Sequence, residues 1–326
     1  MLSTDCRTSY LKGSRVKPKF GIRTTLYEKS FEPIKEYVLT AEKLGYSNIW
    51  VNDHLLPIVG SIEKPMMESW TTLSAIASVT NEIRIGTLVL NNTFRYPQVI
   101  AKMASTLDVV SGGRLELGIG AGWFKKEHEM FGLPYNKHSE RIAMLTEAVE
   151  LLKKLWIDER TTYHGRYYHV NDAVCMPKPL QKPHPPLLIG GYSSRILDVV
   201  AKHADKSNFI LLSSEGFAAK AELLKERCRR IGRDYSKITK SFFGEAMVVK
   251  SEKGVQGEIR KRLRERRMPA KQGMQYAKKC IIGTPDQCIN RIKEYNDAGA
   301  QEFMMVFPHL DAKQIKLFAD SVISCL

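Results

Sequence analysis

The chain has 326 residues, of which 43% are hydrophobic, so it can bury one large core of the size found in single α/β barrels. No segment approaches the roughly 18 apolar residues of a membrane span, and residues 1–18 lack the apolar stretch of a secretory signal. We therefore expect a cytoplasmic protein without a membrane partner. Residues 1–18 are predicted to be a flexible extension, and residues 19–326 a single domain.

The formal charge is +15, from 50 Lys and Arg against 35 Asp and Glu. Clustered cations would favour nucleic acid, but most basic residues here are spread at helical spacing, which is typical of solvated helix faces. One dense run covers residues 261–267. The run could be an exposed helix, an insertion over the active site or a patch for an anionic ligand. We favour the exposed helix, with the anionic-ligand patch second and nucleic-acid binding a distant third. The six cysteines have no CxxC spacing, so neither a zinc site nor a disulfide framework is indicated.

Short apolar segments and helical periodicity alternate along the chain. The strands are expected at residues 19–24, 47–52, 83–90, 114–119, 187–189, 208–211, 241–250 and 303–307. The helices are expected at residues 31–44, 68–79, 97–111, 139–156, 217–230, 284–298 and 312–324. One more helix is expected to follow Gly191 and to end at His203. Pro97 suits a first helical turn, and Ser139 is a candidate N-cap.

Two segments depart from this alternation. Residues 157–186 contain five prolines and predict an extended insertion with a hairpin near His164 and Gly165, and a second insertion covers residues 251–280. Eight strand–helix units without a GxGxxG after the first strand favour a (β/α)8 TIM barrel over an open sheet. Side chains at the carboxyl ends of the strands are then expected to form the functional site.

Several motifs carry a resemblance to a known family. They are SNIWVNDHL, the block from Trp70 to Trp123 with GTLVLNNTFRYP and LELGIGAGW, HGRYYHV, PLLIGGYSS and IGTPDQCINRIKEYNDAG. Together they resemble the luciferase-like monooxygenase superfamily, and within it most closely the coenzyme F420-dependent oxidoreductases, from Phe20 to Leu326. The resemblance implies a barrel with insertions, a deazaflavin or flavin at its C-terminal face, no metal, and a homodimer.

Asp53 and His54 end the second predicted strand. The resemblance implies that both face the deazaflavin and that His54 is the acid/base, a task that imidazole suits near neutral pH. The alternative is that Asp53 caps a turn and His54 is a structural hydrogen bonder.

Further residues are predicted to bind the coenzyme. The resemblance implies a cis peptide at Leu88–Val89, whose bulge supports the ring system. Two glycine-containing turns that follow strands, at residues 120–122 and 190–193, suit a phosphate, and the second fits better because it has hydroxyl donors. Either could instead be only a tight turn. The predicted coenzyme-binding residues are Asp53, Leu88, Val89, Asn91, Gly120, Ala121, Gly122, Gly190, Gly191, Tyr192 and Ser193.

Trp123, Glu68 and Arg95 are predicted to line a substrate pocket. Trp123 stands where sugar-phosphate dehydrogenases of this family have an acidic catalytic residue, which argues against a glucose-6-phosphate-type activity. Glu68 and Glu127 are candidate pocket carboxylates, and either could instead be a charge at a helix N-terminus. Arg95 could bind an anionic group or form a surface salt bridge.

The predicted function is hydride transfer between F420 and a small organic substrate. A basic rim would attract the phosphodiester and polyglutamate tail of this coenzyme. One alternative is an FMN-dependent monooxygenase of the same fold. The other is a barrel without catalysis that binds a ligand or nucleic acid.

Overall fold

The computed structural model describes residues 17–266, 268–269 and 272–326. The predicted extension at residues 1–18 therefore lies almost entirely outside the described residues, as does Arg267 of the basic run.

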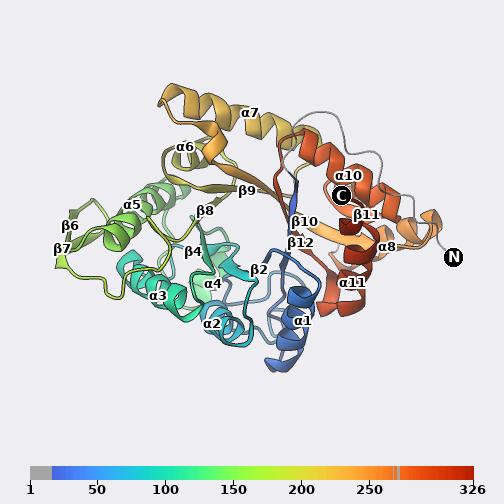
Figure 1. The fold of residues 1–326 in the computed structure, drawn as a ribbon, viewed down its shortest axis with the longest axis horizontal. Coiled ribbons are helices and arrows are strands. Elements are labelled where there is room, and N and C mark those ends of the chain that lie inside the picture. Colours follow the sequence, from blue (N-terminus) through green and yellow to red (C-terminus); the bar gives the residue numbers. More distant parts are fainter. Residues whose placement is uncertain (1–16, 267, 270–271) are drawn as a thin grey trace.

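Eight parallel strands close into a barrel, as the alternation predicted (Figure 1). The ring runs β1, β2, β3, β5, β8, β9, β10, β12 and back to β1, with every neighbouring pair parallel. These strands are β1 Lys19–Arg23, β2 Asn48–Val51, β3 Arg84–Thr87, β5 Leu115–Gly120, β8 Leu187–Gly190, β9 Lys206–Ile210, β10 Thr239–Val248 and β12 Glu302–Val306. Two short strands extend the sheet, β4 Leu90–Asn91 beside β5 and β11 Ile281–Gly283 beside β10.

Helices cover the outside of the barrel, and their apolar faces form one continuous core with the outward-facing strand residues (Figure 1). They are α1 Glu32–Lys43, α2 Ser69–Val79, α3 Pro97–Val110, α5 His138–Ile157, α6 Ser194–His203, α7 Ser214–Arg230, α10 Pro285–Asp297 and α11 Ala312–Ser321. None of the helices in the described part of the chain is long and apolar enough to cross a membrane.

The interior of the barrel is filled in layers because alternate residues of each strand point inward. Near the amino ends of the strands, Lys206 of β9 binds Glu116 of β5 and Glu302 of β12. Above them lies a small apolar cluster of Trp50, Leu188 and Met304. Its upper surface is formed by Leu88, Val89 and Phe243, which are partly exposed. The barrel is thus solid below and open only at the carboxyl ends of its strands.

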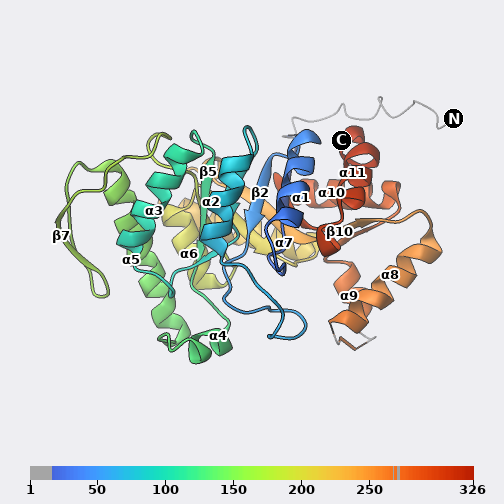
Figure 2. The same cartoon turned by 90° about the horizontal axis from the view of Figure 1, so that it is seen from below.

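The segments that surround this open end lie together at one edge of the molecule. Figure 2 shows α4 Lys125–Met130, α8 Glu252–Glu265, α9 Gly273–Ala277 and the loop between β2 and α2 on the side away from the C-terminus. The insertion at residues 157–186 contains the predicted hairpin, formed by β6 Thr161–His164 and β7 His169–Ala173, which lies beyond α5 and away from this edge.

Three local predictions were wrong. The long helix begins at His138, and its N-cap is Lys137 rather than Ser139. The predicted strand at 83–90 divides into β3 and β4 around the cis peptide Leu88–Val89. The described part of the basic run is helical to Glu265 but not wholly solvated, since Arg262 is 5% exposed and binds Glu245 of β10. Arg262 is buried because it meets Glu245 of β10, a tertiary contact that sequence periodicity does not encode.

Candidate functional site

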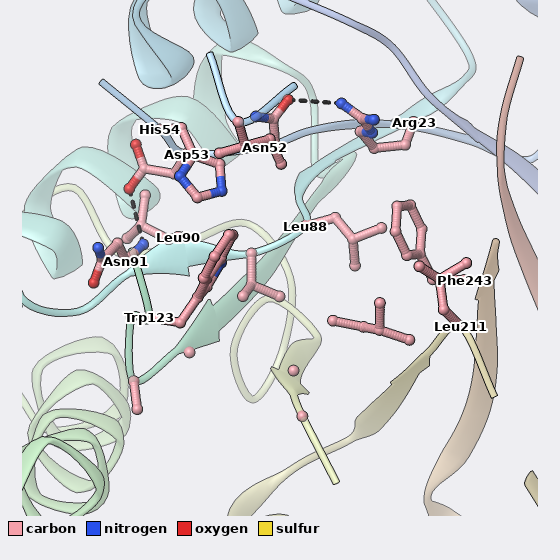
Figure 3. A pocket seen from close by; sticks show the side chains of 18 of the residues that line it. Arg23, Asn52, Asp53, His54, Leu88, Leu90, Asn91, Trp123, Leu211 and Phe243 are labelled. Carbon is pink, nitrogen blue, oxygen red and sulfur yellow. Dashed lines mark hydrogen bonds between the residues drawn. The ribbon is translucent and has the colours of Figure 1, made fainter. Parts of the chain in front are cut away.

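A cavity of about 770 Å³ opens at the carboxyl ends of the barrel strands. Clefts of this size hold cofactor-sized and drug-sized ligands in other proteins. Figure 3 shows side chains from opposite walls pointing into it, with His54, Asp53 and Trp123 toward one end and Arg23, Phe243 and Leu211 toward the other. The lining is mainly apolar, with a few polar groups at defined places.

The floor of the cavity is a bulge between β3 and β4. The peptide Leu88–Val89 is cis, as the resemblance implied. The Val89 side chain fits against two glycines of neighbouring strands, where an added Cβ would lie 2.8 Å (Gly120) and 2.9 Å (Gly190) from its carbon atoms. These glycines are therefore needed for the bulge to rise between the strands.

His54 is oriented by a buried carboxylate. Its Nδ1 donates to Glu127 Oε1 at 2.9 Å, and Glu127 Oε2 accepts from the backbone N–H of Leu55 at 2.9 Å. The Glu127 side chain is 0% exposed, and that of His54 is 11% exposed. Because the carboxylate accepts at Nδ1, Nε2 is the basic nitrogen of the neutral ring. Glu127 lies in the first turn of α4 and does not itself line the cavity, which agrees with the helix-N-terminus alternative for this residue.

Asp53 lines the cavity, but both of its carboxylate oxygens are engaged. Oδ2 accepts from Asn91 N and Arg95 Nη1, each at 2.8 Å, and Oδ1 accepts from Arg95 Nη2 at 3.2 Å. Burial raises the pKa of Asp53, and the Arg95 guanidinium opposes that rise. In this geometry Asp53 holds the loop after β4 in place.

Two predicted pocket residues do not line the cavity. Arg95 lies behind Asp53 and also donates to Glu68 Oε1 at 2.6 Å. Glu68 caps α2, accepting from the N–H groups of Trp70 and Thr71. The prediction that Glu68 and Arg95 line the substrate pocket is therefore corrected: both support Asp53 and the start of α2. The alternative that Glu68 is a charge at a helix N-terminus is therefore confirmed.

The turn after β8 presents the start of α6 to the cavity. Gly191 has a φ of 113°, a conformation that glycine adopts without strain, and Ser193 caps the helix by accepting from Ile196 N. The hydroxyl proton of Ser193 stays free to donate, and helix N-termini attract anions. Lys220 lies 5.6 Å from the ring centre of Tyr192 and adds a positive charge nearby.

Trp123 stands at the rim with 62% of its surface exposed. Its ring meets the edge of His54, with the ring centres 5.7 Å apart and the planes at 80°. Phe124 stacks on the indole ring, with the ring centres 5.3 Å apart. The indole therefore limits the space beside the imidazole.

The predicted coenzyme-binding residues all line this cavity. They are Asp53, Leu88, Val89, Asn91, Gly120, Ala121, Gly122, Gly190, Gly191, Tyr192 and Ser193. The sequence analysis missed the opposite wall, formed by Arg23, Phe243, Glu245 and Arg266. Arg23 ends the first strand, so its position was a signal that could have been used. Arg266 belongs to the basic run, for which an insertion over the active site was one alternative, but it is tertiary packing that brings α8 to the barrel.

No group of three or more His, Cys, Asp or Glu side chains is arranged to hold a metal ion in the described part of the chain.

Comparison with known proteins gives one sequence family. The profile of the luciferase-like monooxygenases matches residues 16–302. An F420-dependent glucose-6-phosphate dehydrogenase of Segniliparus rotundus is 30% identical, over 90% of this chain and 93% of that protein. An FMNH2-dependent dimethylsulfone monooxygenase of Pseudomonas putida is 33% identical over 42% of this chain and 38% of that protein.

The fold is similar to that of solved structures. One is an F420-dependent secondary alcohol dehydrogenase in complex with an F420–acetone adduct, with a TM-score of 0.83, 20% identity, and coverage of 95% of this chain and 99% of that chain. A coenzyme F420-dependent tetrahydromethanopterin reductase from Methanopyrus kandleri has a TM-score of 0.78 and 19% identity over 94% and 99% of the two chains.

Proposed function

Because the chain belongs to the luciferase-like monooxygenase family and is therefore an oxidoreductase, we propose that it transfers a hydride between coenzyme F420 and a small organic substrate. The observation that carries this proposal is the placement of His54, held by buried Glu127, in the same cavity as the Val89 bulge. The match to an F420-dependent enzyme over nearly the whole chain supports it.

The residues present fit the coenzyme. Gly120 and Gly190 keep the surface over Val89 low, so a flat ring system has an apolar floor. The Ser193 hydroxyl and the N-terminus of α6 would hold a phosphodiester. When bound, the deazaflavin supplies a hydride acceptor or donor.

His54 would move the proton that accompanies the hydride. A carbon that loses a hydride while bonded to a hydroxyl group must also release the hydroxyl proton, and Nε2 of His54 is the base that accepts it. In the reverse direction the imidazolium returns the proton to the carbonyl oxygen. Glu127 stabilises the imidazolium and fixes the ring, while Asp53 positions the neighbouring loop. Trp123, in place of an acidic residue, argues for a substrate other than glucose 6-phosphate.

Direct titration tests the proposal. The protein is titrated with oxidised F420 and separately with FMN, and then reoxidation of reduced F420 by carbonyl compounds is followed without oxygen. We expect F420 to bind more tightly than FMN. Tighter binding of FMN, with oxygen consumption by its reduced form, would instead support a monooxygenase. Binding of neither coenzyme would contradict the proposal. The homodimer and the cytoplasmic location stay predictions.

A further inference from the structure

The cavity contains two buried hydrogen-bond donors without partners. Arg23 ends β1 and Asn52 follows β2, and the two side chains are joined because Arg23 Nη1 donates to Asn52 Oδ1 at 2.9 Å (Figure 3). That bond leaves Asn52 Nδ2 free, and Nδ2 and Arg23 Nε are both buried and without an acceptor. Asn52 is 5% exposed, and both residues line the cavity.

The charge of Arg23 is also uncompensated at close range. Among the described residues no carboxylate lies within ion-pair distance of it. Burial lowers the pKa of Arg23, and a guanidinium stays charged in proteins, so leaving it unpaired is costly. The Arg23 guanidinium also faces the ring of Phe243, whose centre is 5.9 Å from Cζ.

Glu245, a carboxylate that lines the same cavity, is already neutralised. Arg262 and Arg266 of the α8 segment bind its two oxygens, and Glu258 binds Arg262 at 3.2 Å. Three guanidinium groups on this side of the cavity therefore face two carboxylates. A positive charge remains at Arg23, and Arg266 also lines the cavity.

We propose that Arg23 and Asn52 form a subsite for the oxyanion of the substrate, which makes the substrate an organic anion, a carboxylate or a phosphate ester on an apolar body. Arg23 Nε and Asn52 Nδ2 would donate to the oxyanion, and the apolar body would contact Phe243, Leu88 and Leu211. Asn52 and His54 belong to one segment, so the anion and the reacting carbon meet neighbouring side chains. That the bound anion is the substrate of hydride transfer rests on the proposed function. That Arg23 and Asn52 bind an anion does not depend on it.

The test uses three ligands with matched rings: benzoate, phenyl phosphate and benzyl alcohol. Affinity is measured by calorimetry at constant ionic strength, with and without F420. We expect one of the two anions to bind about 10- to 100-fold more tightly than the alcohol. A difference of this size is what one hydrogen bond to a charged group contributes to affinity. The preferred anion distinguishes a carboxylate from a phosphate ester.

Variants assign that preference to the two residues. Arg23→Gln and Asn52→Leu should each lower the affinity for the anion by at least about tenfold and leave the affinity for benzyl alcohol unchanged. Arg264→Gln removes an equal charge from an exposed position of α8 outside the cavity and should change neither. If Arg23→Gln is poorly folded, Asn52→Leu is tested alone. The anion should raise the melting temperature of the wild type more than that of Asn52→Leu.

Two results would overturn the subsite. One is equal affinity for the anions and benzyl alcohol. The other is an Arg23→Gln variant that keeps its anion affinity and loses F420, since Arg23 would then serve the coenzyme. A protein that binds the anion but not F420 would refute the proposed function and leave the subsite standing.

Discussion

At the scale of single residues, the cavity depends on side chains whose hydrogen bonds are fixed by distant parts of the chain. His54 is held by Glu127, which is 73 positions away, and Asp53 by Arg95, which is 42 positions away. Such partners fix the orientation of a side chain, and for histidine also its tautomer, in the folded protein. The side chain then does not have to reorganise during the reaction. A variant of either partner therefore tests the role of the group that it holds.

We expect His54→Ala to slow hydride transfer by about 10²- to 10⁴-fold with little change in F420 affinity, because a positioned acid/base acts on the chemical step. The measurement is single-turnover reduction of saturating F420. His169→Ala, which alters an exposed histidine of the β6–β7 hairpin, should react like the wild type. A His54→Ala variant that only loses coenzyme would make the imidazole structural.

Glu127→Gln extends the same prediction. If Glu127 acts through His54, the double variant should be no slower than His54→Ala alone, because residues that work as a unit have non-additive effects. Additive losses would show that Glu127 acts independently.

His203 makes the stability depend on pH. Burial lowers its pKa to about 4, and Glu150 at 3.4 Å does not offset this. Because the unfolded chain has a pKa of about 6.5 there, the unfolded state takes up the proton first and stability falls as pH drops from about 6.5 toward 4. We expect a loss of about 2 kcal/mol between pH 7 and pH 5 by urea unfolding that is absent in His203→Gln. His169→Gln should keep the wild-type pH dependence.

At the scale of elements, the strands approach one another where side chains are absent. Gly86 gives Trp50 its space, since a Cβ there would lie 2.5 Å from the indole ring. Gly118 is more restricted, because its Cβ would lie 2.0 Å from the backbone oxygen of Thr87 on β3. The same oxygen cannot move without separating β3 from β5.

Gly118→Ala is therefore expected to lower the free energy of unfolding by about 1–3 kcal/mol or more. Gly257→Ala is the matched control: it lies inside α8 with nothing within 4 Å of the added carbon, so it should raise stability by about 0.5–1 kcal/mol. Urea unfolding of both variants gives the comparison. If both variants changed the free energy of unfolding equally, the close approach of β3 and β5 at Gly118 would not contribute to stability.

At the scale of the whole molecule, polar contacts inside the barrel join strands that are far apart in sequence. Lys206 binds Glu116 and Glu302, and Glu302 also accepts from Asn48. Burial and the neighbouring Glu116 raise the pKa of Glu302, and Lys206 opposes this. Lys206 thus bridges two buried carboxylates from different parts of the ring, and Arg84 of β3 also binds Glu116 at 2.5 Å.

We expect Lys206→Met to destabilise the barrel by about 3–5 kcal/mol, because it removes the cation that binds buried Glu302, while Glu116 keeps its ion pair with Arg84. Lys202→Met removes a surface ion pair with Glu150 and should cost less than about 1 kcal/mol. Thermal or urea unfolding measures both. Equal losses would show that the buried network contributes no more than a surface pair.

The class of fold and the end of the barrel at which the cavity opens could be predicted from the sequence alone. Strand and helix periods are local properties, so eight alternating units could be recognised without knowing how they pack. The ends of the strands then placed Asp53, His54, Asn91 and the glycines after β5 and β8 at the same opening, and the motif resemblance supplied the cis peptide at Leu88–Val89.

Which side chains contact one another could be known only from the tertiary structure. Arg95 looked like a pocket residue in sequence, yet ring closure places it behind Asp53. Arg262 and Arg266 belong to a run that suggested a solvated helix, yet α8 packs so that both meet Glu245. The physical reason is that periodicity reports which face of an element is buried, whereas the partner of a buried charge depends on how segments tens of residues apart are brought together.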